Sequence, residues 1–420
     1  MISARQTSEE EPDLPATTAN DYISPAPRVS VQAFCSTAET AAAAQAAGED
    51  RRLAKAHLTV KMGGIAAAIE TYHTQPTPNV IILETEANND ILAGLDELAT
   101  VCDPGTRVVV IGGANDVAPY RELVRRGVND YVVGPVAPLD VVRSICSLFS
   151  ASEAIAVGRI IAIVGAKGGV GASTVAHNVA WAIARDLALD SVVIDLDLAF
   201  GTASLDYNKD PVQGIANAVF SPDRPDTALI ERLMAKCTDR LSLLAAPATL
   251  ERVYDLGEQA FDAIFDTLRM TTPCIVLDVP HQWSGWARRA LVSADDILIV
   301  AEPDLANLRN AKNMLSMLKA ARPNDHAPLY CLNQVRMPKR PEIDAKGFAK
   351  TIESKPIASI PFDPKLFGTA ANNGQMIAEI SARHRTTDLF LQIAHRMTGR
   401  TEVKKSRGSF LSPILRKLRA

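Results

Sequence analysis

The chain has 420 residues, of which 47% are hydrophobic and 22% are charged, and its net charge is −4. This length predicts two or three domains, and the composition is ordinary for a globular protein. The slightly negative charge argues against a uniformly basic nucleic-acid-binding protein, although a local basic patch stays open. We expect no nucleic-acid partner. The six cysteines are scattered and form no C-x-x-C pair, which predicts free thiols in a reducing compartment.

The two ends of the chain differ from the rest in composition. Residues 1–27 are polar and acidic and have no hydrophobic periodicity, which predicts a disordered leader rather than a secretory signal. Residues 401–420 form a basic tail. Nowhere does the sequence approach the roughly 18 consecutive apolar residues that a membrane-spanning helix needs. We therefore expect a cytoplasmic protein.

Residues 28–150 alternate between short strand-like runs and helical patterns. Such βα alternation predicts a domain with an open, doubly wound parallel sheet and helices on both faces. We expect strands at 29–34, 57–61, 79–83, 107–111 and 130–133, and helices at 38–47, 65–72, 91–101, 118–126 and 139–149.

This pattern resembles a response-regulator receiver domain, which implies a site at the carboxyl ends of the strands. A receiver carries paired acids after its first strand, a phosphoacceptor Asp after its third and a lysine after its fifth. This chain has Cys35-Ser36-Thr37, Glu84-Thr85 and Gly134-Pro135 at those places. We therefore expect a pseudo-receiver that is not phosphorylated and serves for contacts; the alternative is a regulatory chemistry of Glu84.

Residues 158–400 again alternate strands with helices, which predicts a second domain with a parallel sheet flanked by helices. We expect strands at 160–164, 191–196, 241–245, 274–279, 296–301, 329–334 and 357–360.

A glycine-rich loop follows the first of these strands. In a P-loop, backbone N–H groups surround the phosphates, a lysine neutralises their charge and a Ser/Thr hydroxyl binds Mg²⁺. Ala172 stands where that lysine belongs, and another lysine, Lys167, lies five positions earlier. We expect Ser173 to bind the metal and to open a helix. The expected nucleotide-binding residues are Lys167, Gly168, Gly169, Val170, Gly171, Ala172, Ser173 and Thr174.

Two later strands end in carboxylates. Asp195 and Asp197 form a D-x-D, from which we expect Asp195 to help hold Mg²⁺ and Asp197 to orient water as a catalytic residue. Asp278 ends a buried strand as in a Walker B motif and would complete the metal shell through water; the alternative is a cap of the next helix. Asn333 offers an amide to an adenine edge, or is a turn asparagine.

Lys167, the D-x-D, the strand ending in Asp278, and Asn333 together resemble the deviant Walker A family that includes MinD and ParA. That resemblance implies an ATP-sandwiched homodimer in which Lys167 reaches the partner's phosphate and acts as a catalytic residue. The family pattern K-G-G-x-G-K-[ST] is broken at Ala172. The receiver-like front, the K-G-G-V-G-A-S-T loop and the segments 195–201 and 360–374 resemble the CpaE/TadZ family more closely. This implies a nucleotide-dependent dimer that localises the Flp (Tad) type IV pilus assembly and secretion machinery at a cell pole.

Phosphoryl transfer depends on charge stabilisation, so losing the lysine at Ala172 predicts retained ATP binding and slow hydrolysis. One alternative is a ParA- or MinD-like partition or division-site ATPase; as a DNA-partition protein it would need a basic DNA-binding surface. Another is a metabolic P-loop enzyme, which would need cluster cysteines or a substrate site.

MinD relatives bind membranes through a C-terminal amphipathic helix. The six basic residues and the apolar Ile414, Leu415 and Leu418 of 403–420 fit that use, or a solvated or protein-docking tail.

Overall fold

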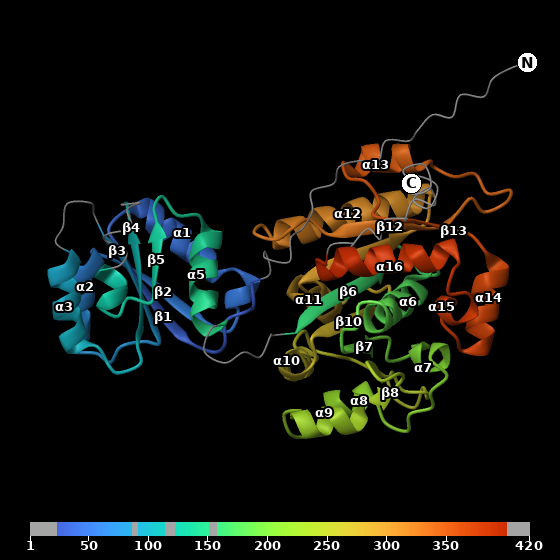
Figure 1. The fold of residues 1–420 in the computed structure, drawn as a ribbon, viewed down its shortest axis with the longest axis horizontal. Coiled ribbons are helices and arrows are strands. Elements are labelled where there is room, and N and C mark those ends of the chain that lie inside the picture. Colours follow the sequence, from blue (N-terminus) through green and yellow to red (C-terminus); the bar gives the residue numbers. More distant parts are fainter. Residues whose placement is uncertain (1–22, 86–90, 114–121, 151–157, 401–420) are drawn as a thin grey trace, which may run out of the picture.

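The computed structural model describes residues 23–85, 91–113, 122–150 and 158–400. These residues form two separate β-sheets with flanking helices, which lie side by side in Figure 1. Residues 1–22 of the expected leader and the tail 401–420 lie outside the described residues, and the helix expected at 118–126 begins outside them. The expected disorder of 1–27 is wrong for its last residues, because Ala26 is buried and its N–H donates to the carbonyl of Arg52 at 2.9 Å. The α/β fold class expected from the sequence is confirmed, whereas the domain limits of 28–150 and 158–400 stay a prediction.

The first sheet has five parallel strands in the order β2-β1-β3-β4-β5. Buried residues of α1 and α5 pack on one face, and those of α2 and α3 on the other. The expected strands all form, with ends that differ by at most two residues. The elements are β1 (Ser30–Cys35), α1 (Ala38–Gly48), β2 (His57–Met62), α2 (Gly64–Tyr72), β3 (Val80–Thr85), α3 (Ile91–Val101), β4 (Arg107–Gly112), β5 (Asp130–Val133) and α5 (Pro138–Ser150).

Glu84, at the end of β3, is fixed by hydrogen bonds to the start of α1. Its carboxylate accepts from the backbone N–H groups of Ser36 and Thr37 at 2.7 and 2.9 Å. It also accepts from the hydroxyls of Thr37 and Thr40, both at 2.7 Å. Burial raises the pKa of Glu84, but these hydrogen bonds outweigh it and lower the pKa below its usual value. The carboxylate thus holds the turn that leads into α1, while the pseudo-receiver function stays a prediction.

The second sheet has eight strands in the order β13-β12-β11-β6-β10-β7-β9-β8. Its strands pair in parallel except β8, a two-residue edge strand that pairs antiparallel with β9 and was not expected. The strands are β6 (Arg159–Gly165), β7 (Ser191–Asp195), β8 (Ala235–Lys236), β9 (Leu241–Leu244), β10 (Cys274–Val279), β11 (Asp296–Ala301), β12 (Leu329–Val335) and β13 (Ser359–Pro361).

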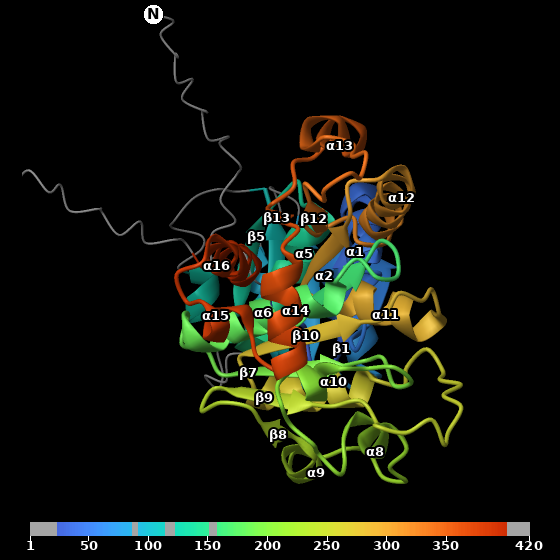
Figure 2. The same cartoon turned by 90° about the vertical axis from the view of Figure 1, so that its right-hand side faces the viewer.

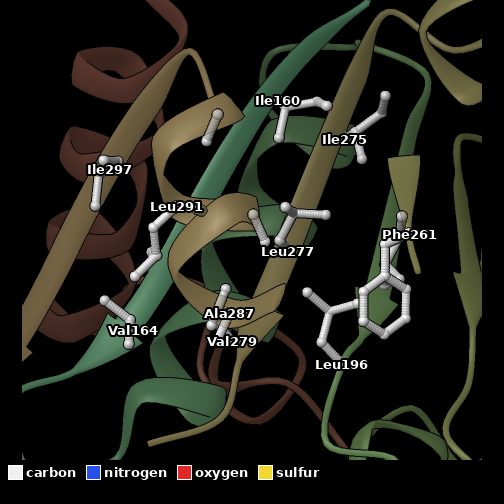
Figure 3. Close-up of a cluster of buried hydrophobic side chains, with 14 of the residues drawn as sticks. Ile160, Val164, Leu196, Phe261, Ile275, Leu277, Val279, Ala287, Leu291 and Ile297 are labelled. Carbon is white, nitrogen blue, oxygen red and sulfur yellow. The ribbon is translucent and has the colours of Figure 1, made fainter. Parts of the chain in front are cut away.

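Helices cover both faces of this sheet (Figure 2). They are α6 (Ala172–Arg185), α7 (Ala203–Asp206), α8 (Ile215–Val219), α9 (Thr227–Leu233), α10 (Asp262–Thr271), α11 (Gly285–Ser293), α12 (Leu305–Ala321), α13 (Ala345–Ile352), α14 (Pro364–Asn373), α15 (Ile377–Ile380) and α16 (Arg385–Thr398). Successive strand residues point to opposite faces, so Ile160 and Val164 of β6 pack toward α11, as Figure 3 shows. Ile161 and Ile163 pack toward α6 and α16. Burial on both faces explains the continuous apolar runs that made these strands predictable.

A buried ion-pair cluster joins the region of the first sheet to the region of the second. Arg51, in the short turn η2 (Arg51–Leu53), places Nη1 3.0 Å from Asp295 Oδ1 and Nε 2.6 Å from Asp325 Oδ2. Arg52 also pairs with Asp325. Only 12% of the Arg51 side chain and 3–4% of the two aspartate side chains are exposed. The two parts of the chain are therefore held together by ion pairs that are nearly inaccessible to solvent.

All six cysteines are free thiols, and four of them are buried, as expected. Among the described helices, none is long and apolar enough to cross a membrane.

Candidate functional site

The glycine loop connects β6 to α6 at the centre of the second sheet. Gly169 and Gly171 adopt φ values of 83° and 79°, in the left-handed region where side chains are strained. A Cβ atom at Gly171 would also lie 2.6 Å from Nδ2 of Asn333. Glycine is required there for both reasons. Helix α6 begins at Ala172, one residue before the expected start.

Four carbonyl groups of this loop are held from outside by side chains of other elements. Amide and imidazole N–H groups donate to them from the end of β10, from α12 and from β12. These hydrogen bonds satisfy the loop carbonyls, and the backbone N–H groups of a P-loop are the groups that bind an anion. The contacts are His281 Nδ1 to Gly165 O at 2.9 Å, Asn310 Nδ2 to Ala166 O at 2.9 Å, Gln334 Nε2 to Gly169 O at 3.2 Å and Asn333 Nδ2 to Val170 O at 2.8 Å.

Sequence reasoning missed His281, Asn310 and Gln334. Polar residues just after β10, within α12 and near the end of β12 were the signal available, but nothing in the sequence indicates which carbonyl each would reach. Asn333 was expected to face adenine; in the structure it is 5% exposed and its Nδ2 donates to the loop. Its contact with a nucleotide stays a prediction.

The loop opens into a cavity of about 800 Å³. Residues 167–173 line it, as does Asp197 from the turn after β7, whereas Thr174 and Asn333 are not among its described lining residues. Lys167 is exposed, and no described carboxylate lies within ion-pair distance of its Nζ. The cavity is therefore large enough for a nucleotide and contains a lysine that no acid in the described part of the chain neutralises.

Ser173 and Asp278 meet at the floor of the site. Ser173 Oγ donates to Asp278 Oδ1 at 3.1 Å. The other carboxylate oxygen, Oδ2, lies 3.2 Å from Nε2 of His177, one turn further along α6. The Nδ1 atom of this fully buried histidine lies 2.7 Å from Oδ2 of Asp206 in α7. Burial lowers the pKa of His177, but its interactions with Asp206 and Asp278 outweigh burial and raise the pKa above its usual value.

Asp195 lies beside Asp278, because the two are register partners on the paired strands β7 and β10. It is 1% exposed, and its carboxylate oxygens accept from the backbone N–H groups of Asp197 and Ala203, both at 3.1 Å. Burial and the neighbouring Asp278 raise the pKa of Asp195 above its usual value, despite those hydrogen bonds. Both oxygens thus hold the turn after β7, and direct metal binding by Asp195 stays a prediction.

Asp197 organises the same turn. Its Oδ1 accepts from the N–H of Phe200 at 3.0 Å, and its carbonyl accepts from the N–H of Gly201 at 2.7 Å. The side chain is half-buried and lines the cavity. It is therefore positioned to face a ligand of the P-loop, although a catalytic role stays a prediction.

The donor set fits Mg²⁺ held together with phosphate, and not a metal held by protein alone. Among the described residues, no group of three or more His, Cys, Asp or Glu side chains could hold a metal ion. A hydroxyl and a carboxylate, here Ser173 and Asp278, are what a P-loop site contributes, since Mg²⁺ keeps waters and takes phosphate oxygens as its other ligands. The imidazole of His177 limits how much of the Asp278 carboxylate is available.

Comparison with known proteins identifies two regions. The AAA domain family model matches residues 158–329. The septum site-determining protein MinD of Synechocystis is 27% identical over 163 residues, which are 39% of this chain and 60% of that protein. The chain thus spans less than two thirds of that MinD. The second region has the MinD fold. The structure of MinD from Pyrococcus horikoshii, solved with Mg-ADP, is 21% identical, with a TM-score of 0.50. The match covers 57% of this chain and 95% of that one.

The pilus assembly protein CpaE of Caulobacter crescentus, known from a crystal structure, matches the N-terminal portion. It is 47% identical, and 98% of that chain and 30% of this one are covered. The chain belongs to the CpaE family. The TM-score of this match is 0.29, so the assignment rests on its sequence identity and coverage. The family expected from the receiver-like front and the altered P-loop is confirmed.

Proposed function

We propose that this chain binds ATP with Mg²⁺, dimerises around the nucleotide and positions pilus assembly and secretion machinery at a cell pole, with slow hydrolysis. The observation that carries the proposal is the P-loop itself. Its carbonyls are held by four outside side chains, and it opens into a nucleotide-sized cavity that contains Lys167, a lysine with no described acidic partner. Ser173 and Asp278 would hold Mg²⁺, the latter through water, and the ion would supply charge neutralisation at the phosphates.

Apolar side chains around the cavity support dimerisation. Phe200, Leu250 and Val253 line it with 72%, 64% and 94% of their surface exposed. Exposed apolar groups gathered at one site are typical of a surface that a partner covers. A second copy placed on this surface would cover them and bring each Lys167 toward the opposite nucleotide.

The altered loop supports slow turnover. Ala172 lines the cavity at the place of the usual lysine, so the loop provides backbone donors and a helix N-terminus but one cation fewer. Such a site retains most ground-state binding and loses transition-state stabilisation.

Sizing chromatography with light scattering tests the dimer. Wild type and Lys167→Ala are compared with no nucleotide, with ADP and with ATP, each with Mg²⁺. We expect wild type to be dimeric only with ATP and Lys167→Ala to stay monomeric. Lys346→Ala, which alters an exposed lysine of α13 outside the cavity, serves as the matched control. A wild type that stays monomeric with ATP contradicts the proposal.

Membership of the CpaE family supports the proposed role at the pole, and we propose the basic tail as an attachment to an anionic membrane surface. A fluorescent fusion of the full chain should form a polar focus that Lys167→Ala disperses. Co-sedimentation with vesicles containing anionic lipid should weaken when residues 403–420 are removed. A uniformly distributed wild-type fusion would refute polar positioning. Equal sedimentation with and without residues 403–420 would refute membrane attachment by the tail.

A further inference from the structure

The cavity contains a second cation that comes from far along the chain. Among its described lining residues, only Lys167 and Arg252 carry a permanent positive charge, and Asp197 is the acid. Arg252 lies in the connection between β9 and α10, eighty-five residues after Lys167 in the sequence. Neither motif nor spacing marks it. The fold alone brings this arginine to the P-loop.

Aromatic rings hold the Arg252 side chain in place. Its Cζ atom lies 4.9 Å from the ring centroid of Phe220, a geometry that attracts a guanidinium to the ring face. Phe220 in turn contacts Tyr254, with ring centroids 6.1 Å apart, and Tyr254 lines the same cavity. The guanidinium is therefore supported on one face without being neutralised by that support.

No described carboxylate lies within ion-pair distance of Arg252. A guanidinium has five N–H donors in a planar fork, and this fork matches two oxygens of a phosphate. Arginine stays charged at physiological pH. An exposed arginine that lines the same cavity as a phosphate-binding loop, with no described acidic partner, therefore has its donors available for an anionic ligand.

The loop lacks the cation that a phosphate would otherwise meet at position 172. We propose that Arg252 binds the terminal phosphate of the nucleotide held by the P-loop of its own chain, and so supplies part of the charge that Ala172 does not. This inference rests on the proposed nucleotide binding. It separates the tasks of the two cations: Lys167 reaches the partner's nucleotide, while Arg252 reaches the nucleotide in its own cavity.

Equilibrium binding of fluorescent ATP and ADP with Mg²⁺ tests the assignment. Wild type, Arg252→Ala, Arg252→Gln and Arg252→Lys are measured at concentrations where light scattering shows monomers. We expect Arg252→Ala and Arg252→Gln to lose about tenfold or more in ATP affinity and less than about twofold in ADP affinity, the size expected for one charge-assisted hydrogen bond. Arg252→Lys should lose less, because it keeps the charge without the fork.

Arg232→Ala is the matched control, since Arg232 is an exposed arginine of α9 that does not line the cavity. Circular dichroism checks that each variant is folded. If Arg252→Ala does not fold, Arg252→Gln tests the same charge while keeping most of the side chain. Equal losses for ATP and ADP, unchanged ATP affinity, or an ATP preference that appears only in dimers would overturn the inference. A wild type that binds neither nucleotide would refute the proposed function instead.

Discussion

His177 Nε2 lies 3.2 Å from Asp278 Oδ2, and this contact joins the P-loop helix to the end of the central strand β10. The other ring nitrogen faces Asp206, so one buried imidazole lies between two carboxylates. A neutral imidazole can donate from only one nitrogen, whereas the protonated ring can donate from both. The histidine therefore fixes the candidate Mg²⁺ ligand and connects it to α7.

Removing this imidazole should weaken the fold. His177→Ala leaves the nearly buried Asp278 with one partner fewer and Asp206 without its histidine, and breaking such a buried pair typically costs about 3 kcal/mol or more. We expect that loss in the free energy of unfolding from denaturant titration. His57→Ala, which alters an exposed histidine of β2, should change it by less than about 0.5 kcal/mol. Equal effects of the two variants would mean that the His177 contacts carry no stability.

Gly201 should tolerate no side chain. A Cβ atom there would lie 2.3–2.5 Å from the carboxylate atoms of Asp195, which is itself fixed by two backbone N–H groups. We expect Gly201→Ala to lower the thermal midpoint and to weaken nucleotide binding, because the turn that carries Asp197 must shift. The control is Gly368→Ala in α14, where a Cβ meets nothing within 4 Å. That change should be neutral or slightly stabilising.

Ala172→Lys should accelerate hydrolysis. The new lysine would enter the cavity next to the loop and add transition-state charge stabilisation, and single groups of this kind are worth about 10²–10³ in rate. Phosphate release under saturating ATP measures the effect. Ala172→Met adds similar bulk without charge and should not increase turnover. A rate for Ala172→Lys no higher than that of Ala172→Met would show that the missing cation does not limit the reaction.

Arg51→Ala should loosen the connection between the two sheets. It leaves the buried Asp295 and Asp325 with fewer cationic partners, a loss expected to cost about 3–5 kcal/mol. We expect a larger radius of gyration in X-ray scattering and faster proteolysis between the two parts. Lys55 also pairs across this boundary, with Asp266, but its side chain is 48% exposed. Lys55→Ala should therefore have little effect.

The same cluster predicts sensitivity to acid. Burial raises the pKa of Asp295, but Arg269 and Arg51 outweigh it and hold the pKa at about 2 in the folded chain. The pKa of an unfolded aspartate is about 3.9, so between about pH 2 and pH 4 the unfolded chain binds more protons than the folded chain. The contribution is complete above about pH 5 and is lost as pH falls toward 2. Asp295→Asn, which cannot titrate, should flatten the fall of the denaturation midpoint below pH 5.

The two sheets and the P-loop could be predicted from local sequence patterns alone. Strands β10 and β11 match their expected ends because strands buried on both faces are continuous apolar runs bounded by polar residues. The edge strand β8 could not be predicted, because two residues are too few to show a hydrophobic periodicity. The loop could be foreseen because a P-loop binds phosphate through local backbone geometry. Its meeting with Asp278, 105 residues away, could be foreseen because the carboxyl ends of parallel strands lie at the same edge of a sheet. The roles of His177, Asn310 and Arg252 could not, since their partners lie 29 to 144 residues away or, for Arg252, across the cavity. Only the folding of the sheet brings such side chains together, and no local pattern records where each will end.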